Sequence, residues 1–108
     1  EAAARVAETY AGQGSALHFT SGLAGDALRR LCLAIFETCG GRAAVFSQVG
    51  NVWQYAIAAP EGQDLRPVAK AMNAALSGRG GGKPTMIQGS CTAPAAAIEA
   101  FFAAYPRK

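Results

Sequence analysis

The residues best suited to chemistry lie in the segment SGRGGGKPTMIQG, at residues 77–89. Four glycines fall within five positions of this segment, and an arginine and a lysine are interleaved with them. Glycine lets a backbone approach a partner closely, and successive backbone N–H groups form an anion-binding concavity. Two nearby cations add attraction for phosphate. We therefore predict a phosphate or nucleic-acid binding site formed by Arg79, Gly80, Gly81, Gly82, Lys83 and Gln88.

A second interpretation of this segment is structural. A glycine-rich loop can simply connect a helix to a strand, with its charges serving solubility. The segment matches neither standard nucleotide signature, because it lacks the GxxxxGK[ST] spacing and because it follows a predicted helix and precedes a predicted strand. P-loops and Rossmann fingerprints have the opposite order, after a strand and before a helix. The sequence alone leaves the binding and structural interpretations open.

The cysteines and the histidine do not form a pattern of known chemistry. The three cysteines are an odd number without CxxC spacing, so we expect Cys32, Cys39 and Cys91 to be free thiols. His18 is the only histidine, and we expect it to be structural. A zinc site needs several His or Cys ligands at recognisable spacing, which the sequence does not offer. We predict no metal or cofactor in this chain.

Composition places the chain in a broad class. Its 108 residues fit one domain, and a hydrophobic content of 51% is enough for a core. The formal net charge of +3 permits contact with RNA without demonstrating it. No apolar run reaches the roughly 18 residues that span a membrane, and no signal peptide is recognisable. We expect a cytoplasmic protein without a membrane partner.

The elements that must position the glycine segment alternate between helices and strands. Residues 26–39 and 65–76 carry apolar side chains at helical spacing, and Asp64 is the expected N-cap of the second helix. Residues 42–48 and 52–59 are expected to form a β-hairpin, with Trp53 and Tyr55 facing the core. The other expected elements are helices at residues 1–11 and from residue 92 or 93 onward, with Pro94 in the first turn of the latter, and strands at residues 15–20 and 85–91.

This order predicts an α/β (α+β-like) fold. We expect a mixed four-stranded sheet that contains the β-hairpin and is covered by helices. Strands joined through a helix should be parallel, by right-handed crossover. The glycine segment is expected to be a loop between the helix at residues 65–76 and the last strand.

The segment LRPVAKAMNAALSGRGGGKPTMIQGS resembles the C-terminal DHH-associated domain of the alanyl-tRNA synthetase family. Members carry a helix, a glycine-rich loop with a Lys/Arg-Pro step, and a short strand ending in Gln-Gly or Gln-Ala. The form GRGGGKP followed by Gln88-Gly89-Ser90 is most similar to stand-alone alanyl-tRNA editing proteins. In the DHH phosphoesterases the matching loop reads GGGH, and Lys83 occupies the position of that histidine here.

The resemblance implies a tRNA-binding accessory domain at residues 13–108, preceded by a helical linker tail at residues 1–12. Its parent would be an editing protein that hydrolyses mischarged tRNA, or a synthetase. Zinc and catalysis would belong to a separate editing domain in cis, so we expect no activity in this chain. The substrate-binding domain of a DHH phosphoesterase and a structural or dimerisation module, hence a homodimer, stay open as alternatives.

Overall fold

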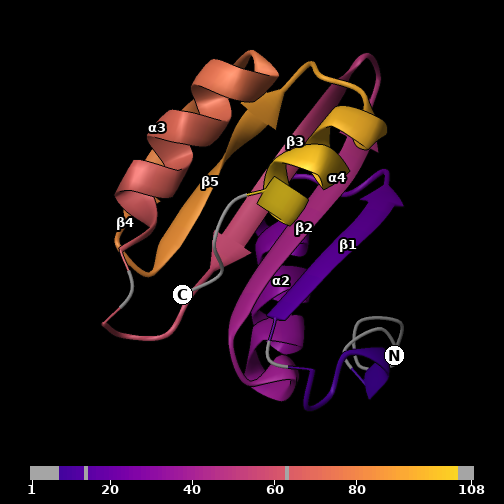
Figure 1. Cartoon of the computed structure of the whole chain (residues 1–108). Helices are drawn as coiled ribbons and strands as arrows, with labels where there is room; N and C mark the ends of the chain where they lie inside the picture. The colour runs from indigo at the N-terminus through magenta and orange to yellow at the C-terminus, as the bar shows by residue number, and fades with distance from the viewer. Residues whose placement is uncertain (1–7, 14, 63, 105–108) are drawn as a thin grey trace.

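A single five-stranded sheet forms the centre of the molecule (Figure 1). The computed structural model describes residues 8–13, 15–62 and 64–104. The strands are β1 (Ser15–Ser21), β2 (Arg42–Val49), β3 (Val52–Ala58), β4 (Gly78–Lys83) and β5 (Met86–Cys91), and the helices are α2 (Gly25–Cys39), α3 (Leu65–Leu76) and α4 (Ala95–Ala104). Within the sheet the strand order is β1-β2-β3-β5-β4, which leaves β1 and β4 at the two edges.

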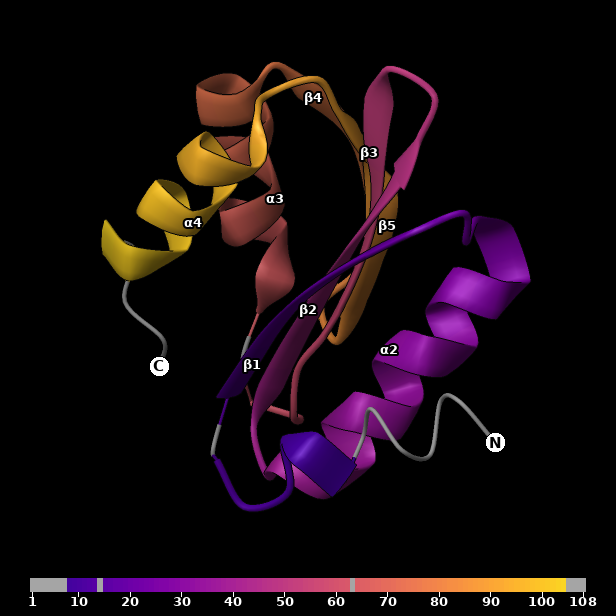
Figure 2. The same ribbon diagram turned by 90° about the vertical axis from the view of Figure 1, so that its right-hand side faces the viewer.

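The helices cover the two faces of the sheet unequally. Figure 2 shows α3 and α4 on one face and α2 on the other. The helix α2 packs against β1, β2 and β3. On the face of the sheet that α2 covers, the strands β5 and β4 therefore have no helix over them at the sheet's edge. This asymmetry leaves room for a groove beside the glycine-rich strand.

The expectation of four strands was wrong. Residues 78–83, which we expected to be a loop, form the fifth strand, β4, which pairs antiparallel with β5. Because the extra strand reverses the direction of the chain once more, β5 runs antiparallel to its neighbour β3, and the parallel pairing expected there does not form. The crossover through α2 does give a parallel pair, β1 with β2.

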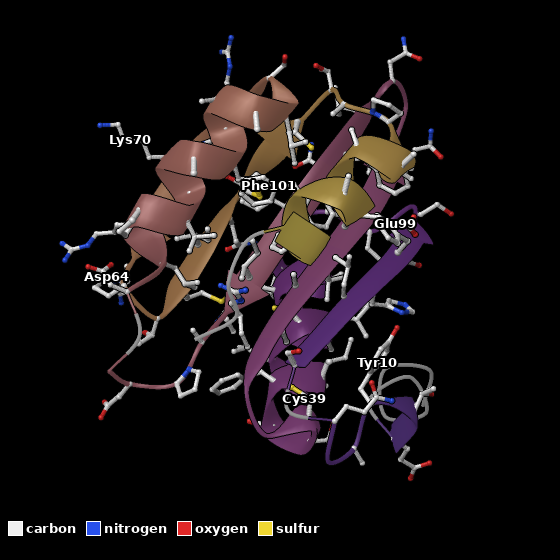
Figure 3. The ribbon with its side chains drawn as sticks, viewed as in Figure 1. Tyr10, Cys39, Asp64, Lys70, Glu99 and Phe101 are labelled. Atoms are coloured by element: carbon white, nitrogen blue, oxygen red, sulfur yellow. The ribbon has the colours of Figure 1, made fainter. Side chains whose placement is uncertain are left out.

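Each long helix begins and packs as its apolar spacing predicts. All five predicted stripe residues of α3 are buried: Leu65, Val68, Ala69, Met72 and Leu76. The carboxylate of Asp64 caps α3 by accepting the N–H of Arg66 at 3.0 Å, and Figure 3 shows Asp64 at the beginning of that helix. In α2 the apolar residues expected at helical spacing, Leu28, Leu31, Cys32 and Ile35, are also buried, and Phe36 is half-buried.

Two cores lie on opposite faces of the sheet. One, under α3 and α4, contains Phe46 and Tyr55, with Trp53 at its margin, which confirms that the hairpin aromatics face the core. The other, under α2, contains Cys32 and Cys39. All three cysteines are free, as predicted, and all three are buried.

The N-terminal end of the described chain packs beside β1. The hydroxyl of Tyr10 lies 3.0 Å from Nδ1 of His18, and the two rings meet edge to face. Burial lowers the pKa of His18, so this ring stays neutral at physiological pH. His18 therefore has the structural role expected of it. Most of the helix predicted at residues 1–11 lies outside the described residues.

Candidate nucleic-acid interface

The strand β4 is extended despite its four glycines. These glycines differ in backbone φ and in the space that a side chain would have. Gly80 and Gly82 have φ of 146° and 154°, a region that side-chain-bearing residues avoid. A Cβ at Gly80 would lie 2.5 Å from the carbonyl oxygen of Gln88 and 2.6 Å from the hydroxyl of Tyr55. A Cβ at Gly81 would meet nothing within 4 Å. Gly80 is thus required for packing, whereas Gly81 faces open space.

A hydrogen-bonded chain attaches β4 to the helix behind it. The hydroxyl of Tyr55 donates to Oδ1 of Asn73 at 3.1 Å, and Nδ2 of Asn73 donates to the carbonyl oxygen of Gly80 at 3.2 Å. Burial raises the pKa of Tyr55, and its hydrogen bond with the side chain of Asn73 opposes that rise. Tyr55 therefore remains a neutral donor to Asn73. The side chain of Asn73, on α3, in turn holds Gly80 in place through its hydrogen bond to the Gly80 carbonyl oxygen.

The turn at the other end of β4 is held as well. The carbonyl oxygen of Pro84 accepts the N–H of Leu65 at 2.8 Å, and that of Thr85 accepts the N–H of Ala59 at 3.0 Å. Lys83, the last residue of β4, therefore belongs to a strand whose two ends are both held by hydrogen bonds. Its ammonium group remains exposed.

Successive residues of β4 point to opposite faces of the sheet. Gly78 and Gly80 face Asn73 and Tyr55, on the side of α3. Arg79, Gly81 and Lys83 consequently face the side of α2, and all three are exposed. The sequence places the two cations and the unobstructed glycine on one face.

An open groove of about 440 Å³ lies on that face, between α2 and the β4–β5 hairpin. It is lined by Arg29 and Leu33 from α2 and by Gly81, Gly82, Lys83, Thr85, Met86 and Gln88 from the hairpin. The side-chain amide of Gln88 donates to the carbonyl oxygen of Gly25 at 3.4 Å, which links the hairpin to the beginning of α2. An amide nitrogen carries two hydrogens, so Gln88 keeps a second donor.

The predicted site residues are thus brought together only in part. Four of the six line the groove: Gly81, Gly82, Lys83 and Gln88. Arg79 lies on the same face, opposite Ser90 in the β4–β5 pairing, but outside the groove lining. Gly80 turns toward the core side. The extended strand also replaces the concave nest of N–H groups that a loop could form.

Arg29 is the charged lining residue that was not among the six predicted site residues. It belongs to the exposed face of α2 by periodicity, and only the position of β4 makes that face one wall of a groove. Within the part of the chain that the structure describes, no acidic side chain lies within salt-bridge distance of Arg79 or Lys83, whereas Arg29 pairs with Asp26. The positive charge of the hairpin is therefore available to a ligand.

Neither a metal centre nor a membrane span occurs in residues 8–13, 15–62 and 64–104. No three of the His, Cys, Asp and Glu side chains in these ranges are placed to share an ion. The helices of the same ranges are too short or too polar to cross a bilayer.

The fold and groove define a class: an α+β module with a mixed five-stranded sheet and a cationic groove at its glycine-rich edge. Among solved structures, the chain is similar to the C-Ala domain from Aquifex aeolicus alanyl-tRNA synthetase, with a TM-score of 0.68 and 19% sequence identity over 83% of this chain and 89% of that one. The chain thus has the fold of a C-Ala domain, in line with the family that its sequence resembles. No family model and no curated protein matches the sequence.

Proposed function

We propose that this chain is a tRNA-binding accessory domain of an alanyl-tRNA synthetase family protein. One observation carries the proposal: the groove presents the exposed Lys83 beside the backbone of Gly81, where no side chain obstructs approach. A polyanion needs cations and close access, and both are present on one face. The likeness to a domain of alanyl-tRNA synthetase supports tRNA as the polyanion.

The finer assignment follows from the sequence resemblance. The parent would be a mischarged-tRNA editing protein, with zinc and catalysis in a separate editing domain in cis. Residues 13–108 would form the accessory domain and residues 1–12 the helical linker tail. Three free thiols support a reducing, cytoplasmic setting. A phosphoesterase parent is disfavoured by Lys83 at the position of the motif histidine, and a dimerisation module would pair through the open edge of β4.

The test is tRNA affinity as a function of salt concentration, using unfractionated tRNA. We expect Lys83→Ala to weaken binding and to lower the slope of log affinity against log salt by roughly one unit, because one phosphate contact is lost. Arg79→Ala should act in the same direction. The control is Lys70→Ala, which removes an equal charge from the solvent side of α3, on the far face of the sheet from the groove (Figure 3).

Gly81→Val tests access separately from charge. Since Gly81 faces open space, the variant should melt like the wild-type chain yet bind tRNA more weakly even at low salt. If Lys83→Ala and Arg79→Ala both behave like Lys70→Ala, the groove is not the binding site. Sedimentation of the wild-type chain at several concentrations would then show whether β4 pairs two copies instead.

A further inference from the structure

We propose that Arg29 is the second cation of the groove, and that Asp26 competes with nucleic acid for it. This inference rests on the proposed function and adds an intramolecular competitor to it. Nη2 of Arg29 lies 3.4 Å from Oδ1 of Asp26, one turn earlier on α2. Arg29 lines the groove from α2, facing the hairpin that carries Lys83. A phosphate bound there would take the place of the Asp26 carboxylate.

The geometry indicates that moving Arg29 from Asp26 to a phosphate requires little free energy. The side chains of Arg29 and Asp26 are 46% and 63% exposed, so water and salt screen their attraction. A separation of 3.4 Å is also long for a charge-assisted hydrogen bond. Arg29 therefore loses little when it turns from a carboxylate to a phosphate.

Asp26 keeps good partners after Arg29 leaves. Its other oxygen, Oδ2, lies 3.0 Å from Nε of Arg30. Asp26 also stands in the first turn of α2, where a negative charge is stabilised by the unpaired N–H groups of the helix. The carboxylate thus remains near the groove as a negative charge that lowers the affinity for polyanions.

The lining of the groove also indicates which part of a nucleic acid it contacts. It contains two cations, two glycines, an amide, a hydroxyl and the two aliphatic side chains of Leu33 and Met86, and no aromatic side chain. Base recognition in single strands depends largely on stacking against aromatic rings. The groove therefore binds phosphates, and its affinity should be independent of base sequence.

The experiment measures the affinity of the full chain for unfractionated tRNA with two matched pairs of variants. Asp26→Asn is compared with Glu37→Gln, because both remove one negative charge from an exposed position of α2. We expect Asp26→Asn to tighten binding about twofold to fivefold more than its control, the range that an exposed ion pair supports. Arg29→Gln is compared with Arg30→Gln, since both arginines pair with Asp26 but only Arg29 lines the groove.

We expect Arg29→Gln to lower the salt slope by roughly one unit and Arg30→Gln to lower it less. In the Arg29→Gln background, Asp26→Asn should gain no more than Glu37→Gln does. Equal effects within both pairs would overturn this inference while a loss of affinity in Lys83→Ala upholds the proposed function. Absence of tRNA binding by the wild-type chain would overturn both. Melting curves identify any variant that fails to fold, and the other pair then decides.

Discussion

At the scale of single residues, Asn73 connects the helix α3 to the strand that carries the groove. Its amide accepts from Tyr55 and donates to Gly80, so one side chain sets the distance between a core aromatic and an edge strand. The sequence did not reveal this role, because Asn73 lies on a helix among alanines and its partners are distant in the chain. By contrast, the burial of Tyr55 could be predicted from its alternation with Trp53 and Ile57.

Asn73→Ala should lower the free energy of unfolding by about 1–2 kcal/mol, because alanine cannot make the two hydrogen bonds that the Asn73 amide forms with Tyr55 and Gly80. For a domain of this size each kcal/mol corresponds to roughly 4–8 °C in Tm. The measurement is urea or thermal unfolding, with Lys70→Ala on the same helix as the control. Tyr55→Phe should show part of the loss. A Tm for Asn73→Ala equal to that of the control would mean that these bonds contribute nothing to stability.

At the scale of elements, the helices were predictable and the edge strand was not. The apolar side chains of α2 and α3 recur at helical spacing, and that periodicity is visible in the sequence. The strand β4 contains four glycines, which have no side chains to show a period of two and have low strand propensity. Pairing with β5 and the bond from Asn73 decide its conformation, and neither can be read locally. Because β4 was not predicted as a strand, β5 was expected to run parallel to β3, whereas it runs antiparallel.

Substitutions along β4 should therefore alternate in effect. Gly80→Ala should destabilise the chain by about 1–3 kcal/mol, because φ is positive there and the new Cβ would meet Gln88 and Tyr55. Gly81→Ala should stay within about 0.5 kcal/mol of the wild type, since its Cβ meets nothing. Denaturant unfolding of the two variants checks this. Equal losses at both positions would show that β4 is not the extended strand described.

At the scale of the whole molecule, the sheet separates two cores, each sealed from solvent by different helices. Cys32 lies in the core under α2, where its Sγ is 3.3 Å from the carbonyl oxygen of Ala56. Burial raises the pKa of Cys32 to about 12. The thiolate is the reactive form, so the Cys32 thiol is inert at neutral pH. Cys91, in the other core, also has a raised pKa because of burial.

The native chain should therefore not react with a thiol reagent at pH 7, and three thiols per chain should react after unfolding without reductant. The pKa of Cys32 is higher in the folded state than in the unfolded one. The contribution of its neutral, buried thiol to the free energy of unfolding is therefore complete below the unfolded pKa of roughly 8.5. It is lost as pH rises from there toward 12. Rapid labelling of a native thiol at pH 7 would show that one core is open.

The edge position of β4 has a consequence for the order in which the molecule opens. Each of the central strands β2, β3 and β5 has a neighbour on both sides, whereas β4 has only β5. Detaching β4 breaks one ladder and the bond to Asn73, and no residue of β4 belongs to either core. Local opening of this kind requires less free energy than global unfolding. One wall of the groove thus belongs to an edge of the sheet, which opens more readily than its central strands, so a ligand bound there would suppress its local opening.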